Sequence, residues 1–208
     1  MGYYPMCLDM AGRSCLVVGG GPLAERKVVG LLQAGARLTV VSPAVTPQLD
    51  DWAREGRIRL IRRRYESSDL AGQSLLFVAT DDGVVNVEVA RDARAAGVLI
   101  NAADDPAHCD FILPAVLRRG ELTVAVSTGG ASPALSRTVR DELDTYLARE
   151  DYAALLSVAA DARRALRAQG VRAPWERWRN ALDAGLRGLV TAGRLGEARE
   201  RLVERLGA

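Results

Sequence analysis

The chain has 208 residues and a formal net charge of +2, and 49% of its residues are hydrophobic while 26% are charged. This is the balance of a folded globular protein, and it excludes a largely disordered chain. Three irregularly spaced cysteines exclude a disulfide framework and are typical of the reducing cytoplasm, where we expect the protein. No apolar run approaches the roughly 20 residues that cross a bilayer, and no dense basic cluster indicates nucleic-acid binding, so neither partner is expected.

The first half of the chain alternates between short apolar runs and amphipathic segments. This alternation predicts an α/β fold of the Rossmann type, a doubly wound parallel sheet with helices on both faces. The apolar runs predict buried strands at 14–18, 37–41, 58–61, 74–79 and 98–101, and the amphipathic segments predict helices at 22–33, 46–55 and 84–96.

The pattern changes after about Leu113. One more strand is predicted at 121–126 and a long helix at 133–149, and the chain is helical from Asp151 onward, with a break at 170–174. The chain therefore divides into three predicted parts. They are a Rossmann domain (1–113), a dimerisation segment (114–150) and a small C-terminal helical domain (151–208).

The middle part carries apolar surface that a finished Rossmann sheet need not bury. Its strand follows the last strand of the sheet and has no partner in the predicted topology. Its helix has apolar residues at fourfold spacing, which places them on one face. Both features predict a homodimer with Leu122–Val126 and the helix 133–149 at its interface.

A glycine-rich turn joins the first strand to the first helix. Residues 19–24, GGGPLA, match the G-x-G-x-x-G/A pattern of dinucleotide-binding turns. Gly19 allows the tight turn, Gly21 lets a pyrophosphate approach the backbone, and Ala24 allows close packing of helix on strand. The start of the helix adds free N–H groups and a partial positive charge. We interpret the turn as a dinucleotide site rather than a purely structural turn.

The end of the second strand lacks the acid that usually holds the adenosine ribose of NAD. The residues there are Ser42, Pro43 and Ala44, and Ser42 can form a weaker hydrogen bond to a ribose. The choice between NAD and NADP is therefore open on physical grounds. The run Arg62–Arg64 can hold a 2′-phosphate or form a solvated basic edge, and we favour the edge.

Polar residues also follow the fourth and fifth strands, at the edge where ligands of doubly wound sheets bind. Thr80 is predicted to contact the cofactor, and Asp82 to cap the next helix. Asn101 lies at the same edge. Asp104 or Asp105 can serve as a general base or shape an Asp-Pro turn, and their positions alone leave both possibilities open.

His108 and Cys109 form a short polar pair in the following loop, and His108 is the one histidine of the chain. A histidine beside aspartates can move protons or bind metal. One histidine and scattered cysteines do not form a standard zinc site. We interpret the pair as part of a surface loop, with a transient metal contact together with Asp104 left open.

A second candidate anion site precedes the long helix of the middle part. Ser127, Thr128 and Gly129 begin a turn rich in hydroxyls and glycines that leads into a helix N-terminus. Ser132 is the predicted N-cap, with Pro133 in the first helical position. Capping and binding of a phosphate or carboxylate are compatible in this turn.

These pieces together resemble a known family, precorrin-2 dehydrogenase, which also forms the N-terminal part of bacterial sirohaem synthase. The combination of GGGxxAxRK, DFILP and STGGxSP is far more specific than the glycine turn alone. The usual C-terminal methyltransferase part of sirohaem synthase has no counterpart in the sequence, so we expect a free-standing dehydrogenase. The matching stretches are 16–43, 77–86, 100–143 and, more loosely, 173–178.

The resemblance implies an activity and assigns residues to it. The family oxidises precorrin-2 to sirohydrochlorin with NAD, and some members also insert Fe²⁺ to make sirohaem. It implies NAD contacts at Pro22, Leu23, Pro43 and Ala44, a catalytic Asp104 and sites built in a homodimer. Because precorrin-2 is a polycarboxylate, four arginines are candidates for binding it, and a solvated surface is the alternative for each. They are Arg118, Arg119, Arg137 and Arg140.

A second class of function stays open. A Rossmann domain with a helical tail can be a regulatory NAD sensor that catalyses nothing. Asp104 and the Ser127–Ser132 turn favour an enzyme, because a sensor needs neither.

Overall fold

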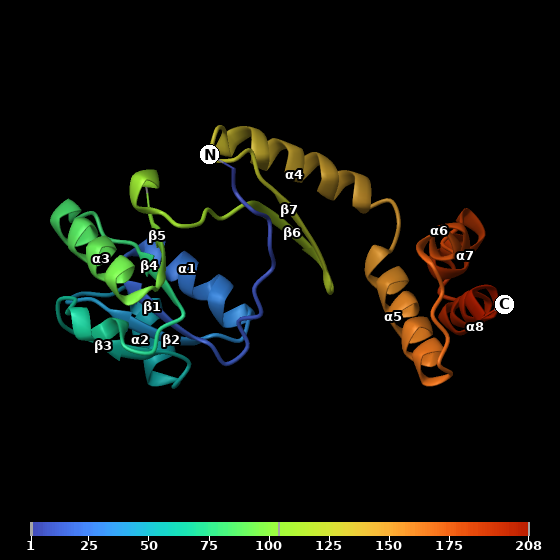
Figure 1. The fold of residues 1–208 in the computed structure, drawn as a ribbon, viewed down its shortest axis with the longest axis horizontal. Coiled ribbons are helices and arrows are strands. Elements are labelled where there is room, and N and C mark those ends of the chain that lie inside the picture. Colours follow the sequence, from blue (N-terminus) through green and yellow to red (C-terminus); the bar gives the residue numbers. More distant parts are fainter. Residues whose placement is uncertain (1, 104, 208) are drawn as a thin grey trace. The chain divides into compact units, whose positions relative to one another are not determined.

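The computed structural model of the chain describes residues 2–103 and 105–207. Asp104, the predicted catalytic residue, lies outside the described residues. The chain forms two compact units that divide after Ile112. In Figure 1 the first unit runs from blue to green and the second from green to red.

The first unit is built on a five-stranded sheet in the order β3-β2-β1-β4-β5, and all its pairs are parallel. The predicted Rossmann-type, doubly wound fold is therefore confirmed (Figure 1). The strands are β1 (Ser14–Val18), β2 (Arg37–Val41), β3 (Arg59–Ile61), β4 (Leu75–Val78) and β5 (Leu99–Ala102). The helices are α1 (Pro22–Gln33), α2 (Pro47–Arg54) and α3 (Gly83–Ala96), with 3₁₀ turns η1 (Ser67–Leu70) and η2 (Pro106–His108).

Each face of the sheet has its own core, and the alternation of β1 shows why. Cys15 and Val17 pack in one cluster with residues of α1 and α2. Leu16 and Val18 point to the opposite face and pack with residues of α3. Because both faces are covered by helices, all four side chains are buried, as the uninterrupted apolar run predicts.

The strand register brings the predicted site residues to one edge. Val18 is level with Val41 on one side and with Val78 on the other, and Val78 is level with Ala102. All these strands therefore end at the same height. The residues that follow them, Gly19, Ser42, Ala79 and Ala103, share one edge of the sheet.

Helix caps fall where the sequence predicts them. The carboxylate of Asp82 accepts hydrogen bonds from the N–H groups of Val84 and Val85 and so caps α3. Gly97 ends α3 in the left-handed conformation, with φ of +67°. The hydroxyl of Ser132 accepts from the N–H of Leu135, 3.1 Å away, and caps the first helix of the second unit.

The second unit begins with a hairpin of which the sequence predicted only one strand. Strands β6 (Ala115–Arg119) and β7 (Leu122–Val126) pair antiparallel, joined by the two-residue turn Gly120–Glu121. The expectation that β7 has no partner in its own chain is therefore wrong. The sequence carries little signal for strand β6, because the strand ends in two arginines, which are typical of surface loops.

Helices complete the second unit. They are α4 (Pro133–Leu147), α5 (Tyr152–Ala168), α6 (Trp175–Ala181), α7 (Ala184–Thr191) and α8 (Leu195–Gly207). Small and branched side chains such as Ala162, Leu186 and Leu202 form the core of α5–α8, each with no exposed surface. The C-terminal helices and the break before residue 175 are as predicted. The role of segment 114–150 in dimerisation stays a prediction.

An ion cluster joins α7 to α8. The carboxylate of Asp183 accepts from the N–H of Leu186 at 2.8 Å and so caps α7. It also binds Arg205 at 2.6 Å and Arg201 at 3.2 Å. The hydrogen bond from Arg205, the cap and the charge of Arg201 lower the pKa of Asp183 to about 2.

Within the described part of the chain, no helix is both long enough and apolar enough to cross a membrane.

Candidate active site

A cavity of about 910 Å³ opens at the edge of the sheet where the strands end. Its wall combines the glycine turn with residues that follow β2, β4 and β5. The lining residues are Gly19, Gly20, Gly21, Pro22, Leu23, Ser42, Ala44, Val45, Thr46, Ala79, Thr80, Asp81, Asn86, Ala103 and Asp105. Most of the predicted cofactor residues are thus brought together, and Pro43 and Asn101 are not part of the wall.

The glycine turn is fixed by close packing. A Cβ on Gly19, whose φ is +120°, would lie 2.3 Å from the carbonyl oxygen of Ala79. A Cβ on Gly20 would lie 2.0 Å from the carbonyl oxygen of Ala44. The carbonyl of Gly20 also accepts from the N–H of Thr46 at 2.9 Å. The sequence analysis gave Gly20 no role, although a third glycine in the turn was the available signal.

Gly21 differs from its two neighbours. Among the described atoms, none lies within 4 Å of the position its Cβ would take, and the residue lines the cavity. Helix α1 begins at the next residue, so its free N–H groups and positive dipole end lie at the cavity wall. No lysine or arginine is among the described residues of the wall. Binding of an anion there therefore depends on the backbone and the helix dipole.

The end of β2 forms a second part of the wall. Ser42 is buried, and its hydroxyl donates to the carbonyl of Ala44 at 2.7 Å. The hydroxyl therefore shapes the turn that Gly20 packs against. Ala44 lines the cavity while Pro43 is exposed beside it. These three residues stay predicted cofactor contacts.

The arginines after β3 are engaged by acids. Arg62 binds Asp50 at 2.5 Å, and Arg63 forms two hydrogen bonds with Asp69, at 2.7 and 2.8 Å. The hydrogen bonds from Arg63 lower the pKa of Asp69. Arg62 and Arg63 thus form a paired basic edge, the interpretation that the sequence analysis favoured.

Thr80, after β4, holds the start of α3 in place. Its hydroxyl accepts from the N–H of Asp82 at 3.1 Å, and its carbonyl accepts from the side-chain amide of Asn86 at 3.3 Å. Thr80 and Asn86 both line the cavity. Thr80 is a predicted cofactor contact, whereas the sequence indicates no role for Asn86.

Asn101 is buried and turned toward the protein interior. Its amide nitrogen donates to the carbonyl of Phe111 at 2.9 Å, and its oxygen accepts from Lys27 at 3.3 Å. The thiol sulfur of Cys109 lies 3.2 Å from the N–H of Ala102 and 3.1 Å from its carbonyl oxygen. Burial raises the pKa of Cys109. Asn101 and Cys109 thus close the loop that follows β5, and a cofactor contact of Asn101 stays a prediction.

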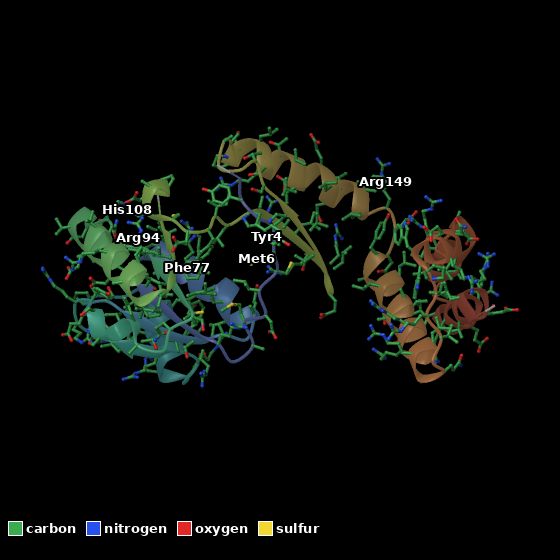
Figure 2. The ribbon with its side chains drawn as sticks, viewed as in Figure 1. Tyr4, Met6, Phe77, Arg94, His108 and Arg149 are labelled. Carbon is green, nitrogen blue, oxygen red and sulfur yellow. The ribbon has the colours of Figure 1, made fainter. Side chains whose placement is uncertain are left out.

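Asp105 and His108 form a pair on this loop. Oδ2 of Asp105 lies 2.6 Å from Nδ1 of His108, and Asp105 lines the cavity. Arg94 of α3 donates to the carbonyl of Ala107 at 3.3 Å, and Figure 2 shows Arg94 and His108 on this part of the unit. Among the described residues, no three His, Cys, Asp or Glu side chains form a group that can hold a metal ion.

The predicted substrate residues belong to the second unit. The hydroxyl of Ser127 accepts from the N–H of Gly129 at 3.1 Å, and that of Thr128 accepts from the N–H of Ser132 at 3.0 Å. These hydroxyls therefore stabilise their own turn.

The candidate arginines for substrate binding differ in whether an acidic side chain already binds them. Arg118 and Arg137 are exposed and form no ion pair within the described residues. Their neighbour Arg119 differs, because it binds Asp144 at 2.9 Å.

Comparison with known proteins places the chain in a family. Residues 6–115 match the family described as "Putative NAD(P)-binding". The chain belongs to this family. The match covers the glycine turn and the whole cavity wall, and it supports a nicotinamide dinucleotide as cofactor. Residues 119–145 match a second family, described as "Sirohaem biosynthesis protein central".

Individual relatives agree with the resemblance found in the sequence. A siroheme synthase from Nitrosococcus oceani is 41% identical over 200 residues, 95% of this chain and 42% of the relative. One from Methylococcus capsulatus is 39% identical over 207 residues, 98% of this chain and 43% of the relative. The chain thus spans less than half the length of these relatives.

A solved structure described as "SirC, precorrin-2 dehydrogenase" is similar along most of the chain. Its TM-score is 0.70 at 27% identity, and the match covers 97% of this chain and 100% of that one. The predicted family resemblance and fold are both confirmed.

Proposed function

We propose that the chain is an NAD-dependent precorrin-2 dehydrogenase that forms sirohydrochlorin on the way to sirohaem. The observation that carries the proposal is the Gly19–Gly21 turn, which opens onto the cavity at the start of α1. The likeness to a precorrin-2 dehydrogenase over 97% of the chain supports the substrate. The test follows NADH absorbance when precorrin-2 and NAD⁺ are mixed with the protein. Binding of NAD⁺ without any turnover would favour the alternative, a regulatory NAD sensor.

The reaction removes a hydride and a proton from the macrocycle. Bound NAD⁺ supplies the hydride acceptor, C4 of its nicotinamide. A proton acceptor must also face the macrocycle, and we assign this role to Asp104, on the sequence and the family resemblance. Asp105 shapes the loop instead, because its carboxylate is held by His108 at 2.6 Å.

NAD is the proposed cofactor rather than NADP. A 2′-phosphate needs a basic partner near the end of β2. Among the described residues the cavity wall holds no such partner, and Arg62 and Arg63 are neutralised by Asp50 and Asp69. Calorimetric titration should give tighter binding of NAD⁺ than of NADP⁺, and equal affinities would contradict the assignment.

Substrate carboxylates are assigned to the second unit. Arg118 and Arg137 offer exposed guanidinium groups for bidentate pairing. The turn formed by Ser127, Thr128 and Gly129 precedes the N-terminus of α4, whose dipole adds a partial positive charge. Substitution of either arginine by glutamine should raise KM for precorrin-2 and leave the affinity for NAD⁺ unchanged.

The assembly proposed is a homodimer. Although β6 pairs with β7, helix α4 still exposes large apolar side chains, with Leu135 53% and Tyr146 55% exposed. These residues and Leu122–Val126 are the proposed interface. Light scattering should give twice the chain mass of 22.3 kDa, and the single-chain mass at micromolar concentration would refute the dimer.

The family resemblance extends the proposal to a second step, the insertion of Fe²⁺ into sirohydrochlorin. Iron would enter as a substrate of the same chain. An absorbance assay with sirohydrochlorin and Fe²⁺ tests this step separately, because it needs no NAD⁺.

A further inference from the structure

The side chain of Asn86 has an amide orientation fixed by its surroundings. Asn86 lies in the first turns of α3 and lines the cavity. Its Nδ2 donates to the carbonyl oxygen of Thr80 at 3.3 Å. A carbonyl oxygen only accepts, so the atom facing it must be the nitrogen of the amide. The remaining atom, Oδ1, is therefore an acceptor.

This acceptor has no donor in the described part of the chain. Oδ1 of Asn86 is buried, and it has no hydrogen-bond partner among residues 2–103 and 105–207. Most buried polar atoms in proteins are paired, so an orphan of this kind calls for an explanation. Two other buried polar atoms lack a hydrogen bond in the described chain, on Gln73 and Arg140, and neither residue lines the cavity. Asn86 thus combines an orphan acceptor with a place in the cavity wall.

The position of Asn86 indicates which half of a dinucleotide lies near it. In doubly wound sheets the pyrophosphate sits at the turn after the first strand, and the adenosine ribose sits at the end of the second. Here these places are the Gly19–Gly21 turn and Ser42. Asn86 lies on the other side of β1, after β4, so it borders the space left for the nicotinamide half.

We propose that Oδ1 of Asn86 accepts a hydrogen bond from the nicotinamide half of the bound cofactor. The donors in this half are the amine of the carboxamide and the hydroxyls of the ribose, which offer the same chemistry to an amide oxygen. The inference rests on the proposed function only in assuming a nicotinamide dinucleotide. Asn86 is then a binding residue that helps to orient the ring whose C4 accepts the hydride.

The test is calorimetric titration of Asn86→Ala with three ligands. NAD⁺ contains the carboxamide and the ribose of the nicotinamide half, ADP-ribose contains that second ribose without the carboxamide, and ADP ends at the diphosphate and lacks both. We expect affinity for NAD⁺ to fall roughly 3- to 12-fold, the value of one ordinary hydrogen bond, and affinity for ADP to stay unchanged. A parallel loss with ADP-ribose identifies the ribose hydroxyl as donor, and an unchanged affinity for ADP-ribose identifies the carboxamide.

Two results would overturn the inference. One is unchanged binding of NAD⁺ by Asn86→Ala, and the other is an equal loss for ADP, which would indicate a general disturbance of the cavity. If the native chain bound neither NAD⁺ nor ADP-ribose, the proposed function itself would fail, which is a separate outcome.

Two further variants control for the helix. Val87→Ala changes the next residue of α3, whose side chain is 54% exposed and outside the cavity wall, and it should bind all three ligands normally. Asn86→Gln keeps an amide, with a donor for the carbonyl of Thr80 and an acceptor oxygen, so it should retain more affinity for NAD⁺ than Asn86→Ala. An affinity no better than that of Asn86→Ala would count against acceptance by Oδ1.

Discussion

The two units each contain a glycine-rich turn between a strand and a helix, and the two turns are held in different ways. Gly19 and Gly20 are packed against the backbone of Ala79 and Ala44, so the turn of the first unit depends on distant strands. The turn at Ser127–Ser132 is held by its own hydroxyls. In the first turn the N–H of Gly19 donates to Val41, and those of Gly20 and Gly21 have no acceptor among the described residues, so they can meet a ligand. The second turn uses part of its polar groups on itself.

The largest effect is expected from a variant that tests whether the first unit supplies the proton acceptor of the reaction. Asp104→Asn keeps the size of the side chain and removes its basicity, so precorrin-2 turnover should fall by roughly 10²–10⁴-fold. Affinity for NAD⁺ should survive, because the pyrophosphate binds at the glycine turn. Steady-state kinetics and calorimetry measure the two effects.

Asp105→Asn is the matched control, and it should cost much less because that carboxylate is occupied by His108. Native turnover by Asp104→Asn would remove the assignment and leave the proton to water or to a substrate carboxylate.

A second prediction concerns the one open glycine of the first turn. Gly21→Asp places a carboxylate where the pyrophosphate should lie, so binding of NAD⁺ should weaken by about 100-fold or more through like-charge repulsion. The fold should persist, since no described atom lies within 4 Å of the new Cβ. Calorimetry should register the loss while the circular dichroism spectrum stays native. Unchanged affinity would take the glycine turn out of the cofactor site.

A third, smaller effect is the loss of folding stability when a glycine of either turn is replaced by alanine. Gly20→Ala forces a Cβ to within 2.0 Å of a backbone oxygen, and such overpacking costs about 1–3 kcal/mol or more. Gly130→Ala meets no described atom within 4 Å and bears only the strain of a φ of +86°, about 1–2 kcal/mol. Thermal unfolding should show the larger loss for Gly20→Ala. The opposite order would mean that the second turn is the more tightly constrained.

The smallest effect is an acid dependence in the second unit. Because the pKa of Asp183 is lowered from 3.8 to about 2, its ion cluster stabilises the fold above about pH 4. That stabilisation is lost as the pH falls from about 4 to 2. Asp183→Asn can still cap α7, so its free energy of unfolding should change less than that of the native chain between pH 6 and pH 3. Denaturant titrations at both pH values measure this difference, and identical changes would refute it.

The sequence predicted the first unit better than the second for a physical reason. Strands such as 14–18 are buried on both faces and appear as uninterrupted apolar runs, and Asp82 has the chemistry of a helix cap. Strand β6 carries no such run, because only one of its side chains, Leu117, is buried.

The candidate site was predictable where the backbone conformation itself favours one residue type, as at Gly19, whose φ is +120°. It was not predictable where the role depends on a distant partner. Gly20 owes its constraint to Ala44, and Asn101 turns inward toward Phe111 and Lys27. Asn86 is distinguished only by a missing donor, which no sequence pattern reveals.

The strand order of the first unit also bears on how the chain acquires its structure during synthesis. Strand β1 is central, and its partner Leu75 lies 60 positions after Cys15. The middle of the sheet therefore cannot close until β4 has left the ribosome, and such non-local pairing is slow to form. The two strands of the β6–β7 hairpin are separated by only two residues, and the hairpin can form within about 1–10 μs. During translation, the apolar strand β1 must wait for residues that the ribosome has not yet made, and the hairpin has no such delay.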